Sequence, residues 1–302
     1  MNNRFLLNGL SLFAAAFFVS APVWAAPTAT ERLREVIGML QPSECEYYWN
    51  IDTTRARETK KGTYTVAYAA KKSVERWGIL IAAPDTLKGR ALLRDGNRYW
   101  ARNPGELQNR QTRGGQTFLG GILTNKDVFP LMLERSRVVI VSDERNKPKT
   151  AEEQLTEHEK IVQNERFGIL LETGHVRIKQ RRNDDILDEK EVPPQLVMRL
   201  TPNEGGKLDG YTHGLLSVDA DSNRPRWFKL FGVGDRLLKY FVYNDFKRMS
   251  DGRPHPAKTE VYNGLNRSFK SELNLGNIRC TTMPATAFHP NRLSQLGKLL
   301  LR

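Results

Sequence analysis

The chain lacks the residue patterns that most enzymes and metal proteins carry. Its 302 residues include five histidines and two cysteines, and no two histidines stand at the spacing of metal ligands. There is neither a Gly-x-Ser-x-Gly nucleophile motif nor a glycine-rich phosphate loop ending in Lys-Ser or Lys-Thr. We therefore expect no catalytic residue, no metal site and no cofactor, although an enzyme on a binding scaffold stays an alternative because a fold alone excludes none.

Long apolar runs are also absent, with one exception at the start of the chain. Arg4 precedes an apolar run from Phe5 to Val19, and Val23-Trp24-Ala25 follows with small residues at the positions that a signal peptidase reads. The alternative is an uncleaved membrane anchor, but a membrane span needs about 20 apolar residues and this run is shorter. The pattern predicts a signal peptide over residues 1–25, cleavage after Ala25, and export.

Acidic residues are too few to balance the basic ones. The formal net charge is +13, from 47 Lys and Arg against 34 Asp and Glu. Nucleic acid would be the first partner to consider for a cytosolic protein of this charge. For an exported protein, the expected partners of a basic surface are instead phospholipid head groups, lipopolysaccharide or other proteins, so no nucleic-acid partner is predicted. Because the charges are scattered, an ordinary solvated basic surface is an equal alternative.

The two cysteines lie near opposite ends of the mature chain. Cys45 and Cys280 are expected to form a disulfide, because an oxidising compartment favours pairing. Two buried free thiols are the alternative.

The mature chain is predicted to be mainly β with a few helices. A helix is expected at the start, where Thr28 and Glu31 fit a capping box and Leu33, Val36, Ile37 and Leu40 share one face. Two further helices are expected at Asp127 to Arg135 and around Leu293, Leu296 and Leu300. Period-two alternation and turn residues predict strands over most of the rest. No repeat occurs, so residues 26–302 are predicted to form a single domain.

Residues 74 to 129 carry a resemblance to a known family. The stretch begins with Trp77-Gly78-Ile79-Leu80-Ile81-Ala82-Ala83-Pro84, which is followed by Lys88-Gly89 and a strand. Then come Arg98-Tyr99-Trp100 with Pro104, basic residues at Arg110 to Arg113, and Phe118-Leu119-Gly120-Gly121 before Asn125-Lys126-Asp127. This stretch resembles the outer-membrane lipoprotein-sorting family, the LolA-like periplasmic carriers. Pro225-Arg226-Trp227-Phe228 and Pro256-Ala257-Lys258 are similar to that family too. Lys147 to Gln163 and Asn183 to Pro194 are longer and more charged than the family pattern.

The resemblance implies a strongly curved antiparallel sheet that forms a half-open barrel closed by helices, with an apolar cavity for acyl chains. It implies a periplasmic carrier that binds lipids or lipoproteins, taking them from an inner-membrane transporter to an outer-membrane acceptor with transient membrane contact. The runner-up is a regulatory module of the same fold that senses lipid or lipopolysaccharide.

The residues that the resemblance suggests for the site fall into two groups, for which plain core and ordinary solvated arginines are the respective alternatives. Those expected to line the cavity are Trp77, Leu80, Leu92, Trp100, Phe118, Leu123, Phe129, Met132, Phe228, Leu230, Phe241 and Tyr243. Those expected at its rim, near lipid head groups, are Arg76, Arg90, Arg110 and Arg113.

Overall fold

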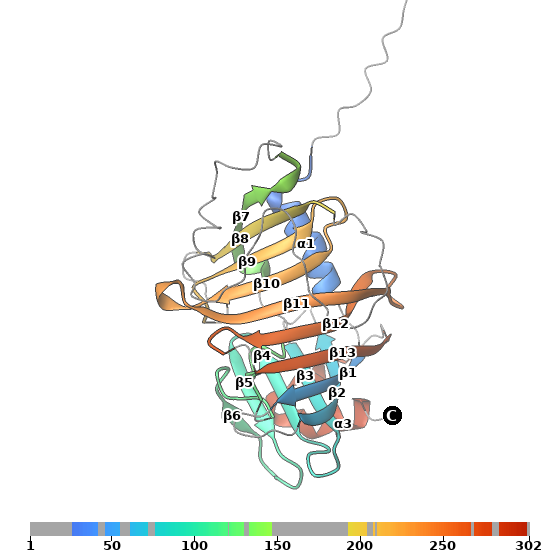
Figure 1. Ribbon diagram of the computed structural model, residues 1–302. Helices are drawn as coiled ribbons and strands as arrows, with labels where there is room; N and C mark the ends of the chain where they lie inside the picture. The colour runs from blue at the N-terminus through green and yellow to red at the C-terminus, as the bar shows by residue number, and fades with distance from the viewer. Residues whose placement is uncertain are drawn as a thin grey trace, which may run out of the picture.

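The computed structural model of the chain is shown in Figure 1. It describes residues 26–41, 46–54, 61–71, 76–119, 121–129, 133–146, 193–203, 208, 210–266, 269–279 and 284–300. The predicted signal peptide, both cysteines, Met132 and nearly all of the two long charged segments lie outside the described residues.

One antiparallel sheet of 13 strands dominates the structure, which confirms the mainly β expectation. Each strand pairs with its sequence neighbour, except that β1 pairs with β13 and so joins the two ends of the chain. β6 and β7 are the two ends of the sheet, which is therefore not closed into a barrel. The strands are β1 Glu46–Thr54, β2 Lys61–Lys71, β3 Arg76–Ala83, β4 Ala91–Asp95, β5 Arg98–Arg102, β6 Arg110–Thr112, β7 Ser136–Asp143, β8 Gln195–Pro202, β9 His213–Asp219, β10 Pro225–Phe231, β11 Leu237–Arg248, β12 Pro254–Asn263 and β13 Lys270–Arg279.

The loop between β6 and β7 shows that the sheet is strongly curved. The ring of Phe129 lies 6.0 Å from that of Tyr99 on β5, while Asp127 contacts Lys239 on β11 at 3.1 Å between Oδ2 and Nζ. β5 and β11 are seven strand positions apart, which is roughly 34 Å in a flat sheet. Two residues of one loop can reach both strands only because the sheet bends around it. One buried apolar cluster accordingly draws side chains from β1–β5, β8–β13, α1 and this loop.

Helix α1 (Ala29–Leu40) packs on this inner face and confirms the first predicted helix. Thr28 and Glu31 form the expected capping box, and Leu33 and Val36 are buried. The guanidinium of Arg32 is also buried and donates to the carbonyl oxygen of Ala220, at 2.9 Å, and to Asn223. This contact fixes α1 to the turn between β9 and β10, so the position of the helix does not depend on apolar packing alone.

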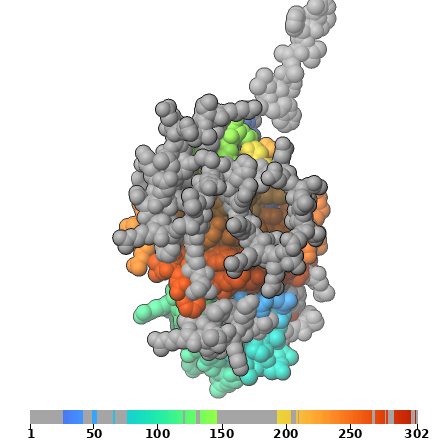
Figure 2. Space-filling view, viewed as in Figure 1, coloured from blue at the N-terminus to red at the C-terminus, as the bar shows by residue number. Residues whose placement is uncertain are grey.

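Helix α3 (Leu293–Leu300) also forms as predicted, but it lies on the other face of the sheet. It packs with Phe288 against Leu80 and Leu93, whereas Ile79 and Ile81 of the same β3 strand face the inner cluster. Neighbouring residues of a strand point to opposite faces. α1 and α3 therefore cover opposite faces, at the two ends of the molecule in Figure 1. The space-filling view shows β3–β6 at the lower end and β11–β13 above them (Figure 2).

The helix predicted at Asp127 to Arg135 is wrong in the part that the structure describes. Residues 125–128 form turns, and only Leu133–Arg135 is helical, as the short 3-10 helix η2. The carboxylate of Asp127 accepts hydrogen bonds from the backbone N–H and hydroxyl of Thr124, at 2.8 and 2.6 Å. These bonds close a turn before Asp127. The other short 3-10 helices are η3 Glu144–Asn146, η4 Val233–Asp235, η5 Ala285–Phe288 and η6 Pro290–Arg292. No described helix is both long and apolar enough to span a bilayer.

The pairing of β1 with β13 bears on the two cysteines. Glu46 and Arg279, which directly follow Cys45 and precede Cys280, face each other across the two strands. The described pairing thus brings together the residues next to the two cysteines, which supports the predicted disulfide. Non-reducing peptide mapping is expected to show Cys45 linked to Cys280. Cys45→Ser is expected to lower the free energy of unfolding by about 2–4 kcal/mol.

The control for this prediction is the double variant Cys45→Ser/Cys280→Ser. It should be no less stable than either single variant, because all three lack the same bond. Titration of two free thiols in the oxidised, unfolded protein would contradict the prediction.

Candidate functional site

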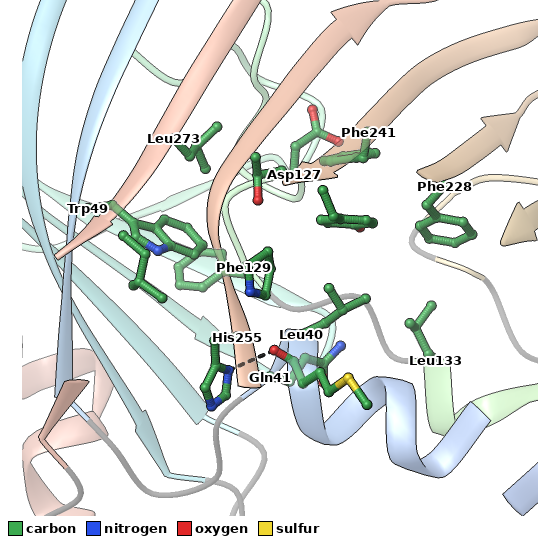
Figure 3. Close-up of a pocket in the computed structure, with 15 residues that line it drawn as sticks. Leu40, Gln41, Trp49, Asp127, Phe129, Leu133, Phe228, Phe241, His255 and Leu273 are labelled. Atoms are coloured by element: carbon green, nitrogen blue, oxygen red, sulfur yellow. Dashed lines mark hydrogen bonds between the residues drawn. The ribbon is translucent and has the colours of Figure 1, made fainter. Parts of the chain in front are cut away.

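An apolar pocket of about 100 Å³ opens between α1, the loop before β7 and the inner face of β10–β13 (Figure 3). Trp49 of β1 and Phe228 of β10 lie on opposite sides of it, with Phe129 between them in the view. It is lined by Met39, Leu40, Gln41, Trp49, Asp127, Phe129, Leu133, Phe228, Phe241, Tyr243, His255, Pro256, Thr259, Leu273 and Leu275.

Aromatic side chains from two neighbouring strands form one wall. Phe228 on β10 and Phe241 on β11 are paired across the strands, with ring centroids 6.4 Å apart. Tyr243 lies two residues further along β11 and on the same face, and its ring stacks on Phe241 at 6.5 Å. The alternation of the strand thus aims a row of rings into the pocket. Such a wall contacts an apolar ligand over a large area.

The end of α1 forms another wall and is held by a histidine. His255 on β12 is almost fully buried; its Nδ1 lies 2.7 Å from the carbonyl oxygen of Met39, and its Nε2 lies 2.6 Å from Oδ2 of Asp251. A carbonyl oxygen only accepts, so Nδ1 donates to Met39. The imidazole therefore ties the last turn of α1 to the turn between β11 and β12, at the mouth of the pocket.

A buried ion pair stands behind the aromatic wall. The side chain of Asp127 is wholly buried, and its carboxylate contacts Lys239, the backbone and hydroxyl of Thr124, and the hydroxyl of Tyr211 at 2.6 Å. Lys239 also donates to the carbonyl oxygen of Ile122. A buried carboxylate is costly unless its oxygens are occupied in this way. We conclude that Asp127 fixes the loop to β11: its Oδ2 is fully engaged by Thr124 and Lys239, and its Oδ1 accepts from Tyr211.

Burial also changes the acidity of the pocket's tyrosine. The surrounding apolar residues raise the pKa of Tyr243 above its ordinary value, because burial disfavours the phenolate. The hydroxyl is therefore neutral at physiological pH. In a pocket made mostly of carbon, this neutral group can orient a ligand without contributing a charge.

The residues predicted from the sequence fall in four places. Phe129, Phe228, Phe241 and Tyr243 line the pocket. Trp77, Leu92, Phe118, Leu123 and Leu230 belong to the same inner cluster but do not line the pocket. Leu80 and Trp100 lie on the opposite face with α3. Met132 lies outside the described residues. Whether any of them binds a ligand stays a prediction.

None of the four predicted rim arginines lines the pocket. Arg76 pairs with Asp95, with 3.0 Å between Nε and Oδ1. Arg90 is half-buried, and that burial, together with the nearby charge of Arg110, lowers its pKa. Arg110 and Arg113 are exposed. These four arginines lie in or next to β3–β6, whereas the described pocket is bounded mainly by β10–β13 and α1.

Sequence reasoning missed the contributions of α1 and β12. The missed lining residues are Met39, Leu40, Gln41, Trp49, Asp127, Leu133, His255, Pro256, Thr259, Leu273 and Leu275. The apolar stripe of α1 was visible, but nothing in it says that the last turn of the helix would end beside β12. Among the described residues, no three His, Cys, Asp or Glu side chains are grouped as a metal site.

Solved structures of other proteins share this fold. The structure superposes on a LolA superfamily protein from Nitrosomonas europaea with a TM-score of 0.63 and 19% identity, over 87% of this chain and 98% of that one. A putative outer-membrane lipoprotein-sorting protein domain from Vibrio parahaemolyticus gives a TM-score of 0.62 and 14% identity, over 88% of this chain and 98% of that one.

A DUF1329 family protein from Desulfovibrio piger gives a TM-score of 0.60 and 12% identity, over 86% of this chain and 95% of that one. Residues 176–295 match the model of a family described as an uncharacterized protein, and no curated protein sequence matches. The resemblance read from the sequence is thus confirmed, and at these identities it establishes the fold.

Breaking the buried ion pair is expected to destabilise the protein strongly. Lys239→Met leaves the buried carboxylate of Asp127 without its cation and should lower the free energy of unfolding by about 3–5 kcal/mol in denaturant titrations. Lys247→Met on the exposed end of the same strand should change it by less than about 0.5 kcal/mol. Equal effects of the two substitutions would show that the ion pair does not hold the loop.

Tyr243 should make stability fall at alkaline pH. Its folded pKa is raised, so above about pH 10, the ordinary pKa of tyrosine, the unfolded state loses a proton that the folded state keeps. Stability from this group is complete below that pH and declines above it. Tyr243→Phe should show a shallower decline between about pH 10 and 11.5 in unfolding titrations. Identical slopes for the two proteins would mean that the phenol is not desolvated.

Proposed function

We propose that the protein is a periplasmic carrier that binds the acyl chains of a lipid or lipoprotein in the pocket between α1 and β10–β13. The observation that carries the proposal is an apolar, aromatic-walled pocket on the inner face of a LolA-like sheet. Each methylene of an acyl chain costs about 0.8 kcal/mol to expose to water. A carrier must therefore offer an apolar surface. The rings of Phe228 and Phe241 and the uncharged Tyr243 supply one in this pocket.

The location and partners in this proposal rest on the sequence. The predicted signal peptide over residues 1–25 directs the chain out of the cytoplasm, and residues 26–302 act as one binding domain. In the proposed pathway an inner-membrane transporter loads the cargo and an outer-membrane acceptor receives it, each during a transient membrane contact. One of the solved structures with this fold is titled a putative outer-membrane lipoprotein-sorting protein domain, which supports this direction of transfer.

Filling the pocket should abolish cargo binding. Leu275 is half-buried on β13 and lines the pocket, so Leu275→Trp places a large ring in a space of about 100 Å³. We expect it to weaken binding of a fluorescent fatty acid by at least about tenfold, measured by titration of the purified mature protein. Mass spectrometry of organic extracts should find stoichiometric lipid or acylated peptide in the wild type and less in the variant.

The matched control is Leu265→Trp, the same substitution at an exposed leucine in the turn between β12 and β13. It should bind as the wild type does, and both variants should keep the wild-type circular dichroism spectrum. Equal binding by all three proteins would refute the pocket as the site. Delivery of the bound lipid to acceptor vesicles separates a carrier from a sensing module, which would bind lipid without releasing it.

A further inference from the structure

A second hollow adjoins the apolar pocket and differs from it in charge. This groove of about 750 Å³ runs beside the exposed face of α1, and its lining is Glu31, Arg34, Glu35, Ile37, Gly38, Met39, Gln41, Glu134, Arg253 and Pro254. Met39 and Gln41 line both hollows, so the last turn of α1 is a wall shared between them. The groove lies in the size range of small-molecule sites, roughly 300–1,000 Å³, and the pocket alone does not.

Two arginine side chains, Arg34 and Arg253, line the groove. Arg34 and Gly38 are four residues apart and therefore share one face of α1. A terminal nitrogen of Arg253, from the turn before β12, lies only 2.7 Å from the point where a Cβ on Gly38 would be. The guanidinium of Arg253 thus rests on the helix one turn from Arg34. Both side chains are exposed, and neither forms an ion pair or side-chain hydrogen bond with a described residue.

The nearest carboxylates are already engaged elsewhere. Glu31 accepts hydrogen bonds from the backbone and hydroxyl of Thr28, at 2.8 and 2.9 Å, and the backbone bond is the main cause of the lowered pKa of Glu31. Glu35 accepts from the amide of Asn223. Glu134 also lines the groove and is exposed. The charges of these three carboxylates act on the groove together with the two arginines, which favours a ligand with one negative charge over a ligand with several. The two arginines remain as the donors that an anion would meet.

We propose that this groove holds the phosphodiester head group of a phospholipid whose acyl chain enters the apolar pocket, an inference that rests on the proposed function. Guanidiniums are suited to phosphate oxygens because each donates several hydrogen bonds in fixed directions. The shared wall at Met39 and Gln41 places the charged and the apolar part of such a ligand side by side. The two hollows together accommodate an amphiphile that neither one fits alone.

The test compares two probes with the same acyl chain: palmitoyl-lysophosphatidylethanolamine, which carries a phosphodiester, and the uncharged 1-palmitoylglycerol, which carries no anionic group. Arg34→Gln and Arg253→Gln should each weaken binding of the lysophospholipid about tenfold, since each removes a charged donor to phosphate. The affinity for palmitoylglycerol should change by less than about twofold. Arg292→Gln, at an exposed arginine of η6 beside α3, is the matched control and should change neither affinity.

The outcomes separate this inference from the proposed function. Binding of both probes with no effect of Arg34→Gln or Arg253→Gln would overturn the head-group site and leave the acyl pocket standing. Failure of the wild type to bind either probe would overturn the carrier function itself. Inorganic phosphate should not displace the lysophospholipid, since it has no chain to bury. Tight phosphate binding by the protein alone, lost in Arg253→Gln, would instead assign the arginines to free phosphate.

Discussion

The contact between Asp127 and Lys239 is the interaction on which the rest of the structure depends. It joins the loop before β7 to β11, 3.1 Å between the charged atoms, inside an otherwise apolar cluster. Two residues later Phe129 reaches Tyr99 on β5. The same short loop therefore bridges strands seven positions apart in the sheet. A buried ion pair adds little stability over an apolar pair of the same shape, but it is specific in direction. Here that specificity fixes which part of the sheet the loop faces.

The curvature explains how a pocket can exist on the inner face. In an open sheet, apolar side chains on one face pack against whatever covers them, and few voids remain. The loop and α1 are both held by polar contacts, Asp127 with Lys239 and Arg32 with the carbonyl oxygen of Ala220. Polar attachments at fixed places keep these two elements from settling fully onto β10–β13. The space left between them is the pocket.

Local patterns in the sequence predicted the elements well, because those patterns depend on near neighbours. The capping box of Thr28 and Glu31 and the alternation of the strands belong to this class. The sequence says less about which face of the sheet a residue lies on. β3 is apolar on both sides, with Ile79 and Ile81 facing one cluster and Leu80 the other. A strand covered on both faces carries no polar side to show which face is inner. Leu80 and Trp100 were therefore assigned to the cavity although they pack under α3.

The site was harder to predict than the fold, since its walls come from segments far apart in the sequence. Met39 and His255 are separated by 216 residues and meet at 2.7 Å. This bridge joins His255 to the carbonyl oxygen of Met39 and to the carboxylate of Asp251, and such bonds contribute about 1 kcal/mol and about 1.5–3 kcal/mol respectively. Breaking the ion pair that holds the loop costs about 3–5 kcal/mol. A chain larger than the present 100 Å³ pocket must displace a wall. The end of α1 has the groove on its other side, so we expect this wall, rather than the loop, to move.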